Sequence, residues 1–337
     1  MTKDEKMRSY KKVIGVDVAS KSLAISLFDG ETHTVVDIEY SQKEIRKTLI
    51  NPFKNEKSSV VFVMESTGIY HTKLAYKLSA AGFKVSVVNP LIIKRYSQMH
   101  LRRVKTDSVD AKLIAEYGYE YQHKLSLFTP KEESQTHVDN LIKAIDDLSQ
   151  QKTVCNNQYL ALKKQANYSK EALRSYKRHL QFISKEIAQL EEELKVLLET
   201  SYKAEYALLS SIPGIGLKLS AMIIAVFHKF ENFHTAKQAC SFAGIAPSPY
   251  ESGTSVKGRG SISKRGNPFA RQMLFMGALV ATMHNPLIKQ QYQRLLENGK
   301  SKMTAIIAAA NKLLRQAFGV LKSGKPFNVN HTISQNI

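Results

Sequence analysis

Residues 59–68 of this chain read Ser-Val-Val-Phe-Val-Met-Glu-Ser-Thr-Gly. The apolar run 59–64 is continuous, which is typical of a strand that is buried on both faces. Glu65 follows the run directly, at the strand end where the binding sites of open α/β sheets form. This stretch predicts a central strand with a carboxylate at the functional edge of a sheet.

Three antiparallel strands are predicted before this central strand. Residues 13–18 and 23–28 alternate or run apolar, and a third strand follows over 32–39. The dipeptide Asp29-Gly30 between the last two is typical of a tight hairpin turn. Neighbouring strands joined by such turns pair antiparallel.

Helix and strand alternate after the central strand. A helix is expected to about Ala81, with Gly82 as its C-terminal stop, followed by a short strand from Lys84 to Val88. A further helix begins after Thr106, which is a good N-cap residue. Three strands followed by alternating helix and strand are the element order of an RNase H-like α/β fold, which we expect to end near residue 125.

Four carboxylates lie at strand ends or on the first turn of a helix: Asp17, Glu65, Asp107 and Asp110. Asp17 lies in an apolar strand, where an acid is costly unless it binds something. Asp107 and Asp110 are three residues apart and share one face of a helix, although they also suit the positive end of a helix dipole. Crowded carboxylates repel each other, so the set predicts a divalent metal, whose usual substrate in a basic protein is a phosphodiester.

The charge balance favours a polyanionic partner. The chain of 337 residues carries 49 Lys and Arg against 29 Asp and Glu, a net charge of +20, and 43% of its residues are hydrophobic. A basic protein without such a partner remains the alternative. The basic residues beside Asp107 are candidates for phosphate contacts, unless they form a solvated face: Arg102, Arg103 and Lys105.

Membrane insertion and a disulfide framework are not expected. The sequence has no run of 18 apolar residues, and Met1 to Lys12 lacks an apolar signal core. Its two cysteines, Cys155 and Cys240, are far apart, which fits a reducing cytoplasmic setting.

Residues 131–200 predict two long helices with a coiled-coil seam. The second helix has apolar residues at alternating steps of three and four, which is the heptad pattern. On sequence alone, the seam fits an intramolecular hairpin as well as a dimer interface. The residues of the second seam are Leu180, Ile183, Ile187, Leu190, Leu194 and Leu197.

A third, mainly helical unit begins near residue 203. Its Pro-Gly-x-Gly turn contains Gly214 and Gly216, and such a turn leaves backbone N–H groups free to meet a phosphate, although glycine turns between helices are common. A loop over 250–267 combines hydroxyls, glycines and cations, which suits either a serine ester in phosphoryl transfer or a nucleic-acid clamp. The cations of this loop include Lys257, Arg259, Lys264 and Arg265.

The ordered set of short motifs resembles the insertion-sequence-110 family, the DEDD transposases related to RuvC-type resolvases. The resemblance covers about residues 12–320. The strings that carry it are Gly15-Val16-Asp17-Val18-Ala19, Met64-Glu65-Ser66-Thr67-Gly68, Val88-Asn89-Pro90, Lys105-Thr106-Asp107-Ser108-Val109-Asp110-Ala111, Ile212-Pro213-Gly214-Ile215-Gly216, Phe242-Ala243-Gly244-Ile245-Ala246-Pro247, Tyr250-Glu251-Ser252-Gly253 and Ser263-Lys264-Arg265-Gly266-Asn267.

The resemblance implies a mechanism and partners. Asp17, Glu65, Asp107 and Asp110 would bind magnesium, and Ser252 would be the nucleophile that becomes linked to DNA. The two sites would form one composite site, assembled from different subunits of a dimer or tetramer. An RNA from the element would guide the enzyme to donor and target DNA, in the cytoplasm of a bacterium or archaeon, on the nucleoid. The family loop often has a second glycine where this chain has Thr254-Ser255, so Ser255 remains a rival nucleophile.

These expectations divide the chain into four parts. They are an RNase H-like domain over 1–125, a coiled-coil segment over 126–202, a helical transposase domain with a Ser-Gly loop over 203–323, and a tail over 324–337. The expected function is cutting and rejoining DNA to move an insertion sequence. The alternatives are a metal-dependent junction nuclease that uses water, and a nucleic-acid-binding protein without catalysis.

Overall fold

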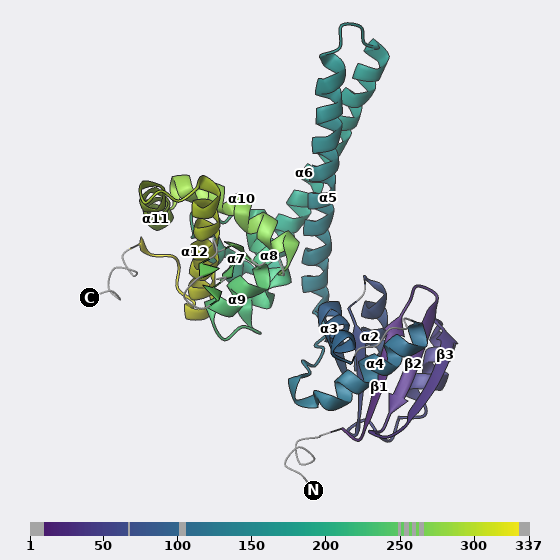
Figure 1. The fold of residues 1–337 in the computed structure, drawn as a ribbon. Helices are drawn as coiled ribbons and strands as arrows, with labels where there is room; N and C mark the ends of the chain where they lie inside the picture. The colour runs from purple at the N-terminus through teal and green to yellow at the C-terminus, as the bar shows by residue number, and fades with distance from the viewer. Residues whose placement is uncertain are drawn as a thin grey trace, which may run out of the picture. The chain divides into compact units, whose positions relative to one another are not determined.

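The computed structural model describes residues 10–66, 68–100, 106–248, 251–252, 256–257, 261–262 and 266–329. The chain divides between Pro130 and Lys131 into two compact units. The first unit is a mixed α/β domain, and the second is mainly helical (Figure 1). This confirms the predicted α/β region followed by a helical region. The finer division into four parts stays a prediction.

The first unit is built on a sheet of five strands in the order β3-β2-β1-β4-β5. Strands β1 to β3 are antiparallel, whereas β1, β4 and β5 run parallel, which is the arrangement expected of an RNase H-like domain. Val60 to Met64 of β4 are fully buried, which confirms the predicted central strand. The strands are β1 (Lys12–Val18), β2 (Ser22–Phe28), β3 (His33–Glu39), β4 (Val60–Glu65) and β5 (Lys84–Val88).

Helices cover both faces of this sheet. The helix α1 (Gln42–Ile45), its π-helical continuation Arg46–Ile50 and α2 (Tyr70–Ala80) bury Ile45, Leu49 and Leu74 on one face. The helices α3 (Pro90–Met99) and α4 (Asp107–Glu120) bury Ile93 and Leu113 on the other. The two cores are separate because successive strand side chains point to opposite faces.

Helix α3 was missed in the sequence, where no element was predicted between the strand that ends at Val88 and the helix that follows Thr106. In the structure Asn89 is the N-cap residue, and its side chain accepts a hydrogen bond of 2.9 Å from the N–H of Leu91. Pro90 occupies the first helical position, where its missing N–H costs nothing.

The second unit begins with a helical hairpin. Helices α5 (Glu133–Lys163) and α6 (Lys170–Ser201) lie side by side along most of their length (Figure 1). Ile183 and Leu194 of the predicted seam are buried within this single chain. The intramolecular hairpin is therefore present, while coiled-coil supercoiling and a dimer seam stay predictions. The remaining helices are α7 (Lys203–Ser210), α8 (Leu217–Val226), α9 (Ala236–Ala243), α10 (Pro268–His284), α11 (Pro286–Glu297) and α12 (Lys302–Ser323).

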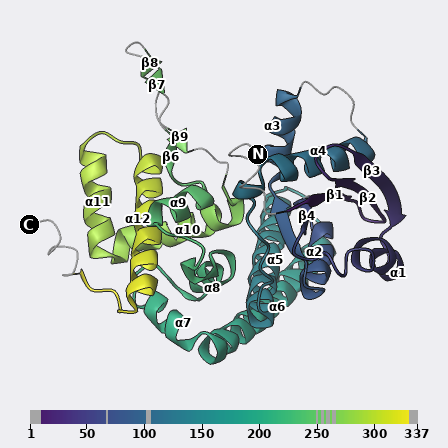
Figure 2. The same ribbon diagram turned by 90° about the horizontal axis from the view of Figure 1, so that it is seen from below.

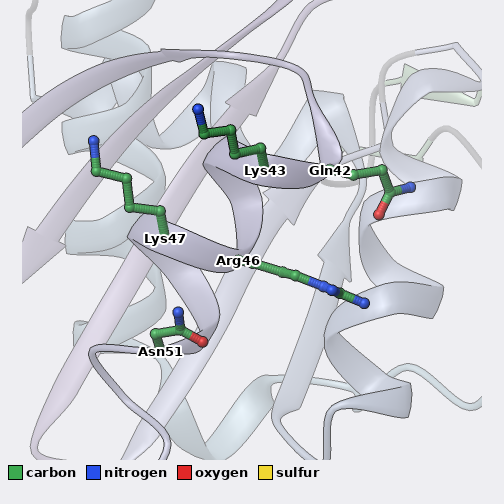
Figure 3. A pocket seen from close by; sticks show the side chains of 5 residues that line it. All are labelled: Gln42, Lys43, Arg46, Lys47 and Asn51. Carbon is green, nitrogen blue, oxygen red and sulfur yellow. The ribbon is translucent and has the colours of Figure 1, made fainter.

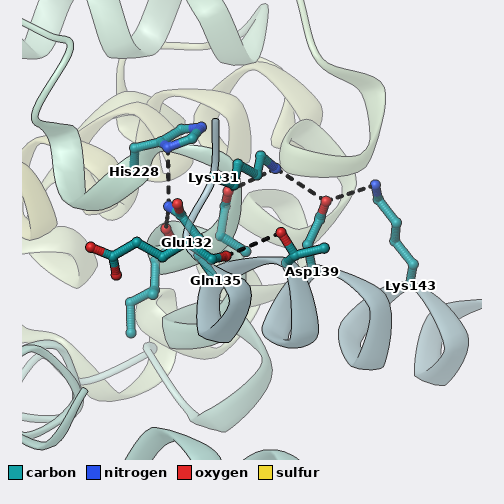
Figure 4. Close-up of polar contacts among 9 residues, drawn as sticks. Lys131, Glu132, Gln135, Asp139, Lys143 and His228 are labelled. Atoms are coloured by element: carbon teal, nitrogen blue, oxygen red, sulfur yellow. Dashed lines mark hydrogen bonds and ion pairs between the residues drawn. The ribbon is translucent and has the colours of Figure 1, made fainter. Parts of the chain in front are cut away.

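A polar network joins the start of α5 to the end of α8 (Figure 4). The side chain of Gln135 donates to the carbonyl of Ile224 and to Nδ1 of His228, both over 3.0 Å. Burial, followed by the charge of Lys131, lowers the pKa of His228, which keeps Nδ1 available as an acceptor. His228 also starts a run of three residues with positive φ, a backbone that is strained in non-glycine residues.

Two short hairpin pairs lie between α9 and α10. Strand β6 (Pro247–Ser248) pairs with β9 (Ser261–Ile262), and β7 (Glu251–Ser252) pairs with β8 (Val256–Lys257). Figure 2 shows them projecting beyond the helices of this unit. No helix within the described ranges is long and apolar enough to cross a membrane.

Candidate active site: a carboxylate cluster at the sheet edge

Two of the predicted carboxylates lie on neighbouring parallel strands. Strand β1 pairs with β4 in a register that places Val16 opposite Met64. Asp17 and Glu65 are the next residue on each strand, so both lie at the C-terminal edge of the sheet. This is the edge at which open α/β sheets bind their ligands.

Close packing between β1 and α4 brings the other two carboxylates to the same place. A Cβ added at Gly15 would overlap the backbone of Ala111 and Ala115 in α4, so only glycine permits this approach. Asp17 is two residues after Gly15 and points to the same face of the sheet. Figure 2 shows α4 running along this face.

The first turn of α4 presents its carboxylates toward the sheet edge. Asp107 is one turn before Ala111, on the face of the helix that meets Gly15. The hydroxyl of Thr106 accepts a hydrogen bond of 3.3 Å from the N–H of Val109, which confirms this residue as the N-cap and fixes where the helix begins. Asp107 and Asp110 lie in the first turn of α4, at the positive end of the helix dipole.

The charges of the other three carboxylates act on Asp17. The pKa of Asp17 is raised from 3.8 to about 6, mainly by burial and then by the charges of Asp107, Asp110 and Glu65, in that order. The N–H of Val18 opposes these effects by donating to the carboxylate. We call these four residues the carboxylate cluster.

The chemistry of the carboxylate cluster fits a hard divalent cation. Carboxylate oxygens are the ligands that Mg²⁺ and Mn²⁺ prefer, and a cation would offset both the burial and the repulsion that raise the pKa of Asp17. Within the described part of the chain, no three His, Cys, Asp or Glu side chains are already arranged as a metal site. The four carboxylates are therefore coupled through charge without forming a closed cage.

The Pro-Gly-x-Gly turn is largely explained by packing. Gly214 has a φ of 105°, and a Cβ there would lie 2.6 Å from the Cβ of Ala281 in α10. The side chain of Asn285 donates to the carbonyl of Pro213 over 3.2 Å, which fixes the turn further. Gly216 is exposed at the N-cap of α8, with open space around it, so a phosphate contact there stays a prediction.

The structure describes only part of the predicted serine loop. The backbone of Ser252 lies in β7, opposite Val256, and the backbone of Lys257 lies in β8. Several predicted residues fall outside the described ranges: Arg102, Arg103, Lys105, Ser255, Arg259, Lys264 and Arg265.

A cationic pocket on α1 was missed in the sequence. Figure 3 shows its lining, in which Lys43 and Lys47 point one way and Gln42 and Arg46 another, with Asn51 below them. The signal available was the spacing of Lys43 and Lys47, since residues four apart share one side of a helix, with Arg46 as a third cation between them. We call these five residues the α1 pocket.

Two family profiles match the chain. Residues 14–168 match a DEDD profile of IS110, described as Transposase, and residues 206–293 match the one described as Transposase IS116/IS110/IS902 family. A solved structure, T. thermophilus RuvC in complex with Holliday junction substrate, aligns with a TM-score of 0.28 and 13% identity. It covers 35% of this chain and 100% of that chain.

Similar proteins extend over almost the whole sequence. The pilin gene-inverting protein of Moraxella lacunata is 30% identical over 323 residues, which cover 94% of this chain and 98% of that protein. Its namesake from Moraxella bovis is 29% identical with the same coverage. An IS110 protein of Streptomyces coelicolor is 28% identical over 135 residues, 40% of this chain and 33% of that protein. This chain therefore belongs to the IS110 family of transposases and is a DNA transposase or recombinase.

Proposed function

We propose that this enzyme cuts and rejoins DNA to move an insertion sequence, with magnesium at the carboxylate cluster and Ser252 as the nucleophile. The observation that carries the proposal is the raised pKa of Asp17, which is surrounded by three further carboxylates at the sheet edge. Perturbed acids gathered at such an edge are candidates for catalysis.

The carboxylate cluster would hold the cation and position DNA. Asp17 and Glu65 offer oxygens from the strands, while Asp107 and Asp110 offer oxygens from the first turn of α4. A bound divalent cation screens phosphate charge and orients phosphate oxygens for displacement. The packing of α4 on Gly15 keeps the two pairs of carboxylates together.

Ser252 would carry out the covalent step. Its Oγ forms a bond to phosphorus and its hydroxyl releases a proton, while the bond from phosphorus to one sugar oxygen breaks and that oxygen takes up a proton. The phosphoserine ester conserves the energy of the broken bond, so attack by a second DNA hydroxyl rejoins the strands. The cations Arg259, Lys264 and Arg265 follow in the same loop and supply charge for the transition state.

DNA inversion is a second candidate function. Two proteins similar over 94% of this chain are named pilin gene-inverting proteins. Inversion and transposition use the same cutting and joining chemistry and differ in which DNA ends are joined. The test uses a plasmid in which a reporter gene lies between two copies of the DNA that flanks this gene. Inversion would reverse the reporter within the plasmid, whereas transposition would move it to another DNA molecule.

Guidance by an element-encoded RNA and assembly into a dimer or tetramer extend the proposal. The first rests on the family resemblance and on the net charge of +20, which suits nucleic acid in general. The second is supported by large apolar residues on the α5–α6 hairpin, where Phe182 is 60% exposed and Val154 is 56% exposed. Exposed apolar side chains of this size are typical of interaction surfaces when they gather.

A trapping experiment tests the proposed chemistry. Purified protein is incubated with a nicked suicide substrate in magnesium, and DNA–protein adducts are separated on denaturing gels and mapped by peptide mass. We expect an adduct on Ser252 that disappears in Asp17→Asn and in EDTA. Cleavage without an adduct would favour the water-dependent nuclease, and binding without cleavage would favour the non-catalytic alternative.

A further inference from the structure

The α1 pocket carries positive charge that the described residues do not neutralise. Lys43, Arg46 and Lys47 are exposed, and none of them forms an ion pair with a described residue. Like charges four residues apart on a helix, such as Lys43 and Lys47, destabilise it slightly. Repulsion between these cations therefore destabilises the isolated protein slightly, and a bound anion would remove that repulsion.

A buried ammonium group lies next to this charge. The Nζ of Lys77 in α2 is inaccessible to solvent and has no hydrogen-bond partner among the described residues. Burial, followed by the charge of Arg46, lowers the pKa of Lys77, so the two cations are close enough to repel each other. A phosphate held by Arg46 would offset that repulsion.

The backbone here is unusual in a way that suits a site. The N–H of Asn51 donates to the carbonyl of Arg46 over 2.9 Å, five residues earlier, which is the hydrogen bond of a π-helix. Single π-helical turns are rare and occur frequently at functional sites. Here the turn contains two of the five residues that line the α1 pocket, Arg46 and Lys47, and a third, Asn51, is its C-cap residue.

The segment that carries the α1 pocket leaves the sheet at the same edge at which the carboxylate cluster lies. Strand β3 runs parallel to β1, because both are antiparallel to β2, so Glu39 ends at the edge where Asp17 lies. Helix α1 begins three residues after Glu39. The hydroxyl of Tyr40 donates to the carbonyl of Tyr70 over 2.8 Å, which ties the start of α1 to the start of α2, the helix that follows Glu65.

We propose that the α1 pocket binds the phosphate backbone of the DNA strand that passes through the carboxylate cluster, at a phosphate other than the one that reacts. The pocket and the cluster lie on opposite faces of the sheet, so the strand crosses the shared edge between them. Cations with amide neighbours, as provided by Gln42 and Asn51, are the usual partners of phosphate oxygens. This inference rests on the proposed function for the identity of the strand.

Salt-dependent binding tests the α1 pocket. The probe is a fluorescent duplex made from the DNA that flanks the gene, and the test variant is Lys43→Gln/Lys47→Gln. The control, Lys11→Gln/Lys84→Gln, removes the same charge from exposed lysines at the opposite edge of the sheet, where β1 and β5 begin. Thermal melts establish that both variants are folded.

We expect the test variant to bind roughly tenfold more weakly at 0.1 M salt and its log–log salt slope to fall by about 2, because each lysine neutralises about one phosphate. The variant Lys43→Arg/Lys47→Arg should restore both quantities. Equal losses of DNA affinity in the test and control variants would show a general effect of charge and would overturn the assignment of phosphate binding to the α1 pocket. A loss confined to an RNA transcribed from the same flanking region would overturn its assignment to DNA.

Asp17→Asn separates this inference from the proposed function. It should bind the duplex with an unchanged salt slope and fail to cleave it, because the lost charge is not a phosphate contact. Cleavage by Asp17→Asn would overturn the proposed chemistry and leave the binding comparison valid. Unchanged binding in Lys43→Gln/Lys47→Gln would overturn the α1 pocket and leave the chemistry standing.

Discussion

Asp17→Asn should make the metal-free protein more stable while abolishing cleavage. In the folded protein the pKa of Asp17 rises from 3.8 to about 6, so ionising this group at pH 7 opposes folding. A rise of about 2 pKa units corresponds to about 3 kcal/mol, and partial exposure to water reduces this to about 1–2 kcal/mol. Asparagine has nearly the same shape without the charge, and its oxygen can still accept from Val18.

The pH dependence has a definite sign. Because the pKa is higher in the folded state, the cost of ionising Asp17 is absent below 3.8, grows between 3.8 and about 6, and is complete above 6. The stability gained by Asp17→Asn should therefore be largest at pH 7 and shrink as the pH falls to 5. Urea unfolding in EDTA at several pH values measures this gain.

Asp37→Asn is the matched control for this experiment. Asp37 is exposed on β3 of the same sheet, so neutralising it should change the unfolding free energy by less than about 0.5 kcal/mol. Magnesium should stabilise the wild type and reduce the advantage of Asp17→Asn, because a cation bound only to the folded state adds stability by mass action. A less stable Asp17→Asn in EDTA, or an equal gain in both variants, would refute the carboxylate cluster.

Three further outcomes are expected. Gly15→Ala should lower the free energy of unfolding by up to ~3 kcal/mol and reduce cleavage, because a Cβ would push α4 away from β1. Gly319→Ala, in the open part of α12, should instead raise the free energy of unfolding by roughly 0.5–1 kcal/mol. Thermal melts of both variants measure these changes. Ser252→Ala should remove the covalent DNA adduct but keep DNA binding, whereas Ser255→Ala should be much milder; an adduct mapped to Ser255 would reassign the nucleophile. The pKa of His228 is lowered in the folded protein, so its contribution to stability is present above pH 6.5 and is lost as the pH falls. His228→Asn should therefore flatten this part of the pH profile of the unfolding free energy. An unchanged profile would contradict the buried neutral state.

Sequence patterns predicted elements where one local rule dominates. Residues 60–64 are apolar at every position and form most of the buried strand β4, while Thr106 caps α4 as the sequence predicted. Helix α3 was missed because its signal, Asn89-Pro90, is shared by strand ends and helix starts. Local sequence cannot distinguish a strand end from a helix start here, since a helix forms only if residues such as Ile93 are buried against a core.

The candidate site depended on contacts that no sequence window contains. Asp17 and Glu65 were predicted to lie at strand ends, but their adjacency needed the register of β1 and β4. Gly214 was interpreted as a phosphate contact, and the structure shows that its lack of a side chain is needed for packing against Ala281. A glycine allows close approach by a ligand or by the protein itself, and sequence alone does not tell which.

The packing of α4 explains how a fold can hold four repelling carboxylates together. Gly15 and Gly118 allow backbone and small side chains to meet so closely that an added Cβ would overlap atoms across the contact. Ala111, Leu113 and Ile114 are buried along the same helix. Burial of about 25 cal/mol per Å² over this contact offsets a repulsion of a few kcal/mol. Stability that comes from the helix body thus holds the charge at its first turn, and under the proposed function a metal bound there would relieve that charge at the site where DNA reacts.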